Sequence, residues 1–478
     1  MKCIKQLVLI GAICLVSGLA SVSFASTEAI VIDTTTSEVS ATTEQEAEAE
    51  QEAEAEQILP SEANADTNES QSSEAETNEG EVEPILYNAD GHPLIVSHNT
   101  TTPEDLKVAL KYDKYLVGND YIVLLNGPVN IRKGPSTSYN VIRRGQRYGK
   151  YKLIETVKGQ YFKSSDTDEW HKIMYYSNGQ VLYGYVYSGI VAVRQYRFDA
   201  AYKKILDMDN MIHGENVAHI SNYKNHNGYP PLYLGKHKED DRAVLRYQAA
   251  PGYFEANLES GFRYLQDGRL LRVDGYDEMF YHVTTFDTKE HYYVPKKYLS
   301  FDSQLANLSQ IIVVDLSNQN EIAFEKQEDG WAVVSYSYAT SGTVSEHKEP
   351  TDPGVYKAIQ KKDKFLYLDD KTKEIAGYAP FAIRFNGGAY IHGFPVNFRL
   401  IKEEIVEQEE ILDEEGNVIQ ERITTEKIID REDPGHIEYS GTLGTIPLSH
   451  KCIRNVTSHA KFLYEWIRIG EAVVIIEE

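Results

Sequence analysis

Cysteine is scarce in this 478-residue chain, which contains three: Cys3, Cys14 and Cys452. The first two lie within residues 1–25, which have the pattern of an export signal. Without that signal the chain keeps a single thiol, so it cannot form an internal disulfide, although an oxidising exterior would permit one. Cys452 lies in the polar stretch LSHKCIRN, a setting that suits a reactive site better than a core.

The export signal has the usual order of parts: two lysines, a long apolar run and then small residues at Ser23 and Ala25. Cleavage after Ala25 predicts a secreted protein. The apolar run, residues 7–24, is 18 residues long and is borderline for a membrane span. Retention of the signal as a membrane anchor therefore stays an alternative.

Lysine and arginine are absent from residues 27–84, which carry 18 of the 73 acidic residues of the chain. This segment, with EQEAEAEQEAEAEQ at its centre, has too few apolar residues to offset its ordering entropy, so we expect an acidic disordered linker over 26–85. Beyond the signal and this linker, 55 acidic and 46 basic residues remain, so the net charge of −25 mainly reflects the linker. The sequence has no basic stripe of the kind that binds nucleic acid.

From residue 121 onward, short apolar and polar alternations separated by Gly, Asn and Asp predict strands and turns, and hence a mainly β fold. Within residues 121–192, the stretches NGPVNIRKGPSTSYNVIRRGQ and EWHKIMYYSNGQVLYGYVYSGIV resemble the bacterial SH3-like domain of cell-wall proteins. The resemblance implies a small barrel that binds peptidoglycan peptides or serves as a spacer. Residues 193–305 predict a further β-rich region. Because residues 292–294 are similar to 184–186, this region resembles a second, degenerate SH3-like unit. The first resemblance is carried by Asn130, Ile131, Arg132, Gly134, Pro135, Ser136, Val141, Gly145, Trp170, Ile173, Gly184, Tyr185 and Val186.

Residues 310–478 contain, in order, the segments IIVVDLSNQNEIAFEKQEDGWAVVSYSYATSG, TDPGVYKA, APFAIRFNGGAYIHGFP and LSHKCIRN. In that order they resemble the YkuD-type catalytic domain of L,D-transpeptidases, which cross-link peptidoglycan through a cysteine. The resemblance implies a β-sandwich-like domain with a helix after the nucleophile and with no metal or organic cofactor. It also implies peptidoglycan stem peptides as substrates, with release of D-Ala from a tetrapeptide stem. Its most specific part is the pair IHG, 391–393, and SHKCIR, 449–454.

The resemblance makes Cys452 the nucleophile. Acyl transfer needs a thiol that is ionised near neutral pH, whereas a free thiol has a pKa near ~8.5. A neighbouring imidazole can take the proton, and a helix N-terminus favours the thiolate. The apolar spacing in VTSHAKFLYEWIRI predicts a helix that begins within a few residues of Cys452.

Two histidines are candidates for the base. His392 ends an apolar strand and matches the base position of the family, with the backbone carbonyl of Gly393 orienting its ring. His436 lies 16 residues before Cys452, a common separation in compact members of the family, and stays the alternative. The two observations agree if residues 402–432, which alternate around a turn at 414–417, form a β-hairpin inserted between base and nucleophile.

The resemblance also assigns a set of residues to substrate binding, in which the planar fork of Arg454 suits a carboxylate. Lys451 stands where the family has glycine, so its side chain either alters the turn and crowds the acyl pocket or lowers the thiol pKa. Two other functions use the same residues: an L,D-carboxypeptidase, in which water takes the acyl group, and a wall-binding protein with a silent catalytic fold. The predicted substrate-binding residues are Ser449, His450, Arg454 and Asn455.

Overall fold

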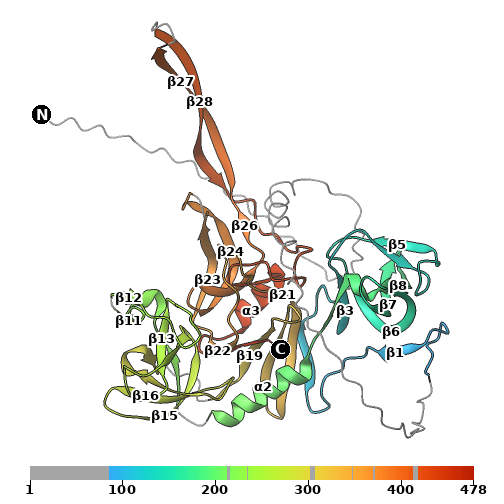
Figure 1. The fold of residues 1–478 in the computed structure, drawn as a ribbon, viewed down its shortest axis with the longest axis horizontal. Coiled ribbons are helices and arrows are strands. Elements are labelled where there is room, and N and C mark those ends of the chain that lie inside the picture. Colours follow the sequence, from blue (N-terminus) through green and yellow to red (C-terminus); the bar gives the residue numbers. More distant parts are fainter. Residues whose placement is uncertain are drawn as a thin grey trace, which may run out of the picture. The chain divides into compact units, whose positions relative to one another are not determined.

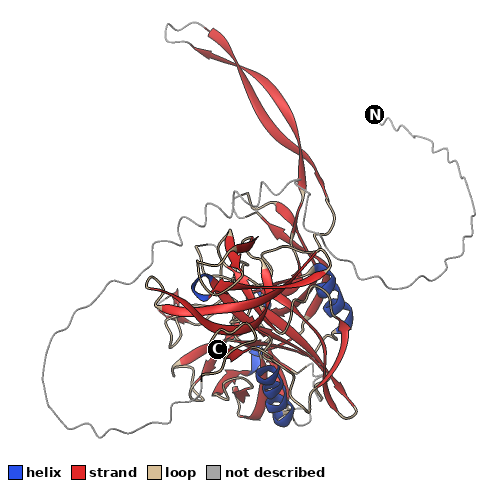
Figure 2. Ribbon diagram, turned by 90° about the vertical axis from the view of Figure 1, so that its right-hand side faces the viewer, coloured by secondary structure: helices blue, strands red, loops and turns tan. Residues whose placement is uncertain are grey.

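Strands dominate the described part of the chain, as the alternating sequence predicts (Figure 2). The computed structural model describes residues 85–212, 216–233, 235–301, 307–346, 348–369, 372–412 and 418–477. The predicted export signal and nearly all of the acidic linker lie outside the described residues. Of the helices within the described ranges, none is long and apolar enough to cross a membrane. The mainly β fold is therefore confirmed for the described residues.

The first sheet has the order β5-β4-β8-β7-β6-β3-β9, with β1 pairing on β6. Its core contains Ile122, Ile131, Leu153 and Ile173. Ile131 and Leu153 alternate with more exposed residues along their strands, whereas all five residues of the strand that carries Ile122 are buried. The sheet occupies the range of the first SH3-like resemblance, whose identification stays a prediction. Its strands are β1 (Leu94–Ser97), β3 (Asp120–Leu124), β4 (Val129–Arg132), β5 (Val141–Gly145), β6 (Lys150–Phe162), β7 (Thr167–Ser177), β8 (Gln180–Tyr187) and β9 (Val191–Gln195).

The second sheet has the order β14-β13-β17-β16-β15-β10-β18. A two-stranded ladder of β11 and β12 and the short helical turn η2 (Tyr223–Asn225) lie between β10 and β13. The strands are β10 (Val217–Ile220), β11 (Leu232–Tyr233), β12 (Lys236–His237), β13 (Ala249–Tyr253), β14 (Phe262–Gln266), β15 (Leu270–Tyr276), β16 (Phe280–Thr285), β17 (His291–Pro295) and β18 (Leu299–Ser300).

The third sheet carries the candidate site and has the order β22-β30-β19-β20-β21-β29-β25-β24-β23, with β2 along β21 and β26 along β24. The predicted helix after the nucleophile is α3 (Thr457–Trp466). The strands are β2 (Lys107–Tyr112), β19 (Gln310–Asp315), β20 (Asn320–Gln327), β21 (Gly330–Thr340), β22 (Gly354–Lys357), β23 (Gln360–Leu368), β24 (Ile375–Asn386), β25 (Ala389–Gly393), β26 (Val396–Asn397), β29 (Ile453–Asn455) and β30 (Ala472–Ile476).

The two faces of this third sheet bury different helices. On β19, Val313 belongs to a core that includes Ile205 of α2 (Phe198–Met211). The next residue, Val314, points to the opposite face and joins a core that includes Leu463 of α3. Full burial of each such side chain stabilises the fold by about 1.5–3 kcal/mol relative to exposure. The sequence predicted a boundary at residue 305. α2 precedes this boundary but packs on the third sheet, which the sequence did not predict.

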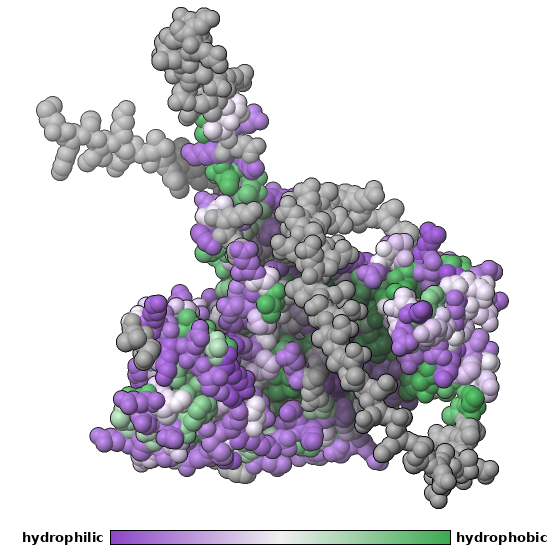
Figure 3. Space-filling view, in the orientation of Figure 1, coloured by the Kyte–Doolittle hydropathy of each residue, from purple (hydrophilic) through white to green (hydrophobic). Residues whose placement is uncertain are grey.

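The predicted insertion is present as a long antiparallel hairpin of β27 (Arg399–Leu412) and β28 (Val418–Glu432), whose register runs from Arg399↔Glu432 to Leu412↔Val418 (Figure 1). Within the described residues these two strands pair only with each other. The predicted turn at 414–417 lies outside the described residues. Exposed apolar residues gather at the root of the hairpin, in an otherwise largely hydrophilic region (Figure 3): Leu400, Ile401, Ile428 and Ile429.

The root of the hairpin is attached to β23 and β24 through polar contacts. Arg431 forms an ion pair with Glu374 at 2.5 Å. Directly after β28, Asp433 pairs with Lys364 at 2.5 Å and accepts a hydrogen bond from the hydroxyl of Tyr378 at 2.9 Å. The Lys364 ammonium is the main cause that lowers the pKa of Asp433 to about 2. The chain therefore leaves the hairpin at a fixed point before it runs on to the nucleophile.

Candidate active site

The strand that carries His392 and the strand that follows Cys452 are neighbours. β25 and β29 pair in parallel, with Ile391 opposite Ile453 and His392 opposite Arg454. Ile391 and Ile453 both face the core beneath α3. Because side chains alternate along a strand, His392 and Arg454 lie on the other face, and so does Cys452, two residues before Arg454. The hairpin separates these residues in sequence, and the sheet brings them together.

His392 is buried, and its Nδ1 donates to the carbonyl oxygen of Gly393 at 2.6 Å, the contact that the resemblance implies. In the tautomer that this hydrogen bond requires, Nε2 carries a lone pair and can accept a proton. Burial lowers the pKa of His392 to about 4; the hydrogen bond to Gly393 opposes this shift, and the charge of Arg454 adds to it. The imidazole is therefore neutral near pH 7 and has a lone pair that can accept a proton, while the same desolvation makes it a weaker base than a free imidazole.

The alternative base, His436, is exposed on the segment after the hairpin. Its ring lies edge-on to Phe381, with 5.3 Å between centroids, and to Tyr378 at 5.9 Å. Both aromatic residues belong to β24, so His436 packs over that strand instead of standing on the strand beside the nucleophile. The geometry favours His392.

Cys452 is half-buried. Its sulfur accepts a hydrogen bond from the backbone N–H of Tyr390, which, with the charges of Arg454 and Lys451, lowers the thiol pKa. Burial acts in the opposite direction and outweighs them, so the pKa of Cys452 lies above its ordinary value. The resting pair is consequently a neutral thiol beside a neutral imidazole, and not the ionised thiol that the sequence led us to expect.

Helix α3 begins close to the nucleophile, as predicted, but its first N–H groups are already occupied. The N–H of Thr457 donates to the carbonyl of Glu438 at 2.9 Å, and the N–H of Ser458 donates to the carboxylate of the same residue at 3.1 Å. A carboxylate at a helix N-terminus satisfies both the free donors and the helix dipole. The N-terminus of α3 therefore stabilises the carboxylate of Glu438, whereas we had expected it to stabilise the thiolate of Cys452.

Lys451 adopts a left-handed backbone conformation, with φ of 67°. Glycine reaches this conformation without steric cost, so glycine would suit this position better than a residue with a side chain. The N–H of Lys451 donates to the carbonyl of Glu349 at 2.8 Å, its carbonyl accepts from Thr351 Oγ1 at 3.0 Å, and its ammonium pairs with the Glu349 carboxylate. Lys451 thus adopts the left-handed turn that suits glycine, and its side chain binds Glu349.

Backbone N–H groups around the nucleophile were expected to form an oxyanion hole. In the free protein the N–H of Cys452 donates to the carbonyl of His450 at 2.8 Å, and the N–H of Lys451 is committed to Glu349. Both donors are therefore satisfied internally before substrate binds, and their use in catalysis requires that these hydrogen bonds be exchanged.

The four predicted substrate-binding residues differ in their surroundings. His450 is exposed and Arg454 is half-buried, close enough to both Cys452 and His392 to lower their pKa values. Ser449 and Asn455 are buried: Ser449 Oγ donates to the carbonyl of Cys452, and Asn455 Nδ2 donates to Glu321 Oε1 at 2.6 Å. The burial of these two does not support contact with substrate; they shape the nucleophile turn and its strand.

Tyr390 is a residue of the site that the sequence analysis missed. It is fully buried two residues before His392, and its ring stacks on Phe365 with 4.2 Å between centroids. Within the described part of the chain, its hydroxyl has one neighbour with which it can hydrogen-bond, the side chain of Tyr223. The alternation that placed His392 on one face of its strand also places Tyr390 there, and this was the available signal.

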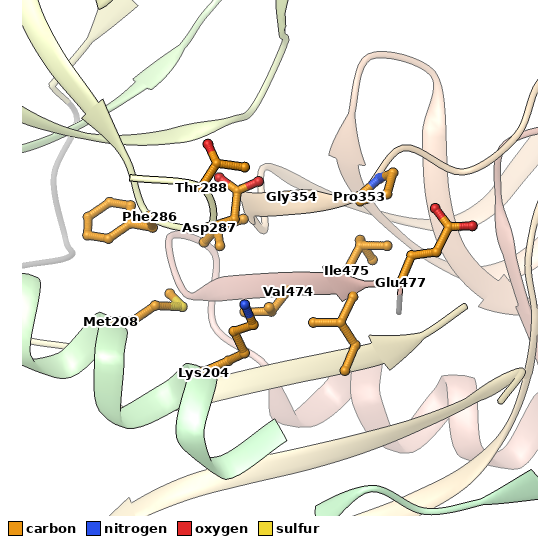
Figure 4. Close-up of a pocket in the computed structure, with 12 residues that line it drawn as sticks. Lys204, Met208, Phe286, Asp287, Thr288, Pro353, Gly354, Val474, Ile475 and Glu477 are labelled. Carbon is orange, nitrogen blue, oxygen red and sulfur yellow. The ribbon is translucent and has the colours of Figure 1, made fainter. Parts of the chain in front are cut away.

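A separate cavity of about 170 Å³ contains none of the predicted site residues (Figure 4). Lys204 and Met208 of α2 line one side, and Asp287 and residues 474–477 line others. Among the described residues there is no cluster of three or more His, Cys, Asp or Glu that could hold a metal ion.

No protein-family model matches this chain, and no curated protein matches it in sequence. Solved structures that match in part include an L,D-transpeptidase from Mycobacterium smegmatis, with 16% identity and a TM-score of 0.24, over 43% of this chain and 82% of that chain. An L,D-transpeptidase from Stackebrandtia nassauensis matches with 20% identity and a TM-score of 0.21, over 37% of this chain and 60% of that chain.

A fused Zn-dependent amidase/peptidase/peptidoglycan-binding domain-containing protein from Clostridium acetobutylicum matches with 18% identity and a TM-score of 0.21. That match covers 35% of this chain and 52% of the Clostridium protein, or about half of its length. At these identities and TM-scores, the chemistry of this chain has to be inferred from its own residues.

Proposed function

We propose that this protein is an exported L,D-transpeptidase that forms peptidoglycan cross-links through a thioester on Cys452. One observation carries the proposal. The buried imidazole of His392, oriented by Gly393, lies on β25, and β25 pairs in parallel with β29. β29 directly follows Cys452, the only cysteine of the sequence outside the leader. The sequence resemblance over 310–478 supports the substrate class. The export signal supports a location outside the membrane, in contact with the cell wall, with membrane attachment only if the signal is retained.

In the proposed reaction, His392 Nε2 takes the thiol proton as Cys452 sulfur attacks the carbonyl of the third residue of a tetrapeptide stem. The tetrahedral intermediate collapses, the bond to the terminal D-Ala breaks, and the imidazolium returns the proton to the leaving amine. An amine of a neighbouring stem then attacks the thioester, forms the cross-link and releases the thiol. Because thiol and imidazole are neutral at rest, this proton transfer accompanies the attack instead of preceding it.

The test is mass spectrometry of muropeptides with tetrapeptide stems after incubation with purified full-length protein. We expect new 3→3 dimers and free D-Ala from the parent and neither from Cys452→Ala, since the side chain supplies the covalent chemistry. Shortened stems without dimers would reassign the protein as an L,D-carboxypeptidase. Unchanged stems would leave a wall-binding protein with a silent catalytic fold.

A carbapenem gives a second readout that needs no stem peptide. Its strained carbonyl should acylate the Cys452 thiol and add its mass to the protein once. Peptide mapping that located the adduct on another residue would contradict the assigned nucleophile.

A further inference from the structure

A loop of the second sheet, residues 221–228, contains two consecutive residues with left-handed backbone. The φ angles of Lys224 and Asn225 are 54° and 58°. This conformation costs a non-glycine residue roughly 1–2 kcal/mol, so two in succession persist only where the surroundings over-determine them. Backbone strain of this kind is found most often at functional sites.

Asn222 holds the loop in place. This residue is fully buried, and its Nδ2 donates to the carbonyls of Gly228 at 2.9 Å and Ala249 at 2.8 Å. Its Oδ1 accepts from the N–H of Asn227 at 3.0 Å, and its own N–H donates to Asp267 Oδ1 at 2.7 Å. Every polar group of this side chain is thus used inside the protein, which makes the loop rigid.

Asp267 connects the loop to the strands of the candidate site. Its Oδ2 lies 2.8 Å from Nη1 of Arg384, and both side chains are almost fully buried. Arg384 is on β24, directly opposite Tyr390 of β25. The guanidinium carbon of Arg384 also lies 4.2 Å from the centroid of the Tyr223 ring. Tyr223, which comes from the second sheet, therefore stands beside the strand that carries Tyr390 and His392.

The buried hydroxyl of Tyr390 has one hydrogen-bonding neighbour among the described residues, the side chain of Tyr223. A buried hydroxyl without any such neighbour would cost about 1–3 kcal/mol. Burial raises the pKa of Tyr390, and the neighbouring Tyr223 and Cys452 raise it further, so the hydroxyl stays protonated and remains a donor. Tyr223 is only half-buried, so its own hydroxyl belongs to a side chain that a ligand can approach.

We propose that the hydroxyl of Tyr223, held by the buried hydroxyl of Tyr390, binds an amide oxygen of the stem peptide, which makes the second sheet one wall of the substrate site. The inference rests on the proposed function and adds a substrate-binding residue from outside residues 310–478. The Asp267 carboxylate balances the charge of Arg384, so the cluster has no net charge and suits an uncharged amide oxygen better than a carboxylate.

The decisive variant is Tyr223→Phe, which keeps the ring over Arg384 and removes only the hydroxyl. Isothermal titration calorimetry of a tetrapeptide stem, in full-length protein that also carries Cys452→Ala, measures binding without turnover. We expect Kd to rise about threefold to tenfold, the equivalent of one neutral hydrogen bond. Tyr229→Phe makes the same chemical change at a side chain that is 69% exposed nearby in the sequence, and should bind as tightly as its parent.

Thermal unfolding of each variant should match the parent, because neither substitution removes packing. Equal affinity in the Tyr223→Phe and Tyr229→Phe proteins would overturn the inference and leave the proposed function intact wherever the cysteine-containing parent makes dimers. A parent that makes no dimers, but whose peptide affinity depends on the Tyr223 hydroxyl, would overturn the proposed function alone. Absence of peptide binding to every variant would overturn the inference whatever the reaction proves to be.

Discussion

Replacing Lys451 by glycine and by alanine tests what holds the nucleophile turn. With φ of 67°, any L-residue at this position pays about 1–2 kcal/mol that glycine does not. Glycine loses about 0.5–1 kcal/mol more backbone entropy on folding than alanine, so the glycine variant should be the more stable of the two by about 1 kcal/mol. Both variants lose the ion pair to Glu349, whose carboxylate side is largely exposed and which is worth about 0.2–1 kcal/mol.

Relative to the parent, Lys451→Gly should therefore be slightly stabilised and Lys451→Ala slightly destabilised. Urea unfolding followed by tryptophan fluorescence measures the difference. Of the three tryptophans, Trp331 lies on β21 of the sheet that carries the turn, and Trp466 lies on α3, which packs on that sheet. For a slope of about 3 kcal/mol per molar urea, 1 kcal/mol separates the midpoints by about 0.3 M.

Thiol alkylation provides the matching chemical readout. The Lys451 ammonium binds Glu349, and its effect on the thiol is smaller than that of burial, so both variants should alkylate at Cys452 within about threefold of the parent. An alanine variant as stable as the glycine variant would refute the strain argument. Equal and large losses of alkylation rate in both would show instead that the lysine is present to activate the thiol.

The remaining predictions concern protonation and the base. His392→Ala should abolish dimer formation and His436→Ala should retain most of it; the opposite ranking in the muropeptide assay would make His436 the base. Alkylation of the free thiol should keep rising with pH beyond the ordinary thiol pKa, because burial raises the pKa of Cys452, whereas a plateau across pH 5–8 would reveal a preformed thiolate. Burial lowers the pKa of Lys150, whose ammonium donates to the carbonyl of Gly441 at 2.9 Å, to about 7. Since the unfolded chain binds this proton up to about pH 10.4, folded stability should increase from pH 7 upward, and Lys150→Met should raise Tm more at pH 6 than at pH 10. A pH-independent difference in Tm would show that the lysine is not desolvated.

Local patterns were sufficient where the structure depends on alternation along one strand. The period of two predicted a mainly β chain, the two arms of the hairpin and the strand that ends at His392. The apolar spacing after the nucleophile predicted α3. The same kind of spacing is present in α2, at Phe198, Ala201, Tyr202, Ile205 and Met208, but it lies in a stretch where β signals surround it and it was not used.

Properties that depend on contacts between distant segments were beyond these patterns. The raised pKa of Cys452 comes from burial by residues far away in sequence, and motif matching could not show that desolvation outweighs two nearby cations. Asn455 illustrates the same limit, because its partner Glu321 lies on another strand of the sheet. A polar residue near a nucleophile has the same local sequence whether it faces substrate or the core.

The segments before residue 310 make contacts with the strands and loops of the candidate site, so they are more than spacers. From the first sheet, Lys150 donates to Gly441, and Arg194 Nη2 donates to the carbonyl of Thr445 at 3.2 Å, so both hold the chain that leads to the nucleophile. From the second sheet, Asp267 holds Arg384 opposite the base strand. α2 covers one face of the third sheet, and β2 extends it along β21. A chain cut before residue 310 would expose that apolar face and release both supports, so the geometry that makes Cys452 and His392 neighbours is a property of the three sheets together.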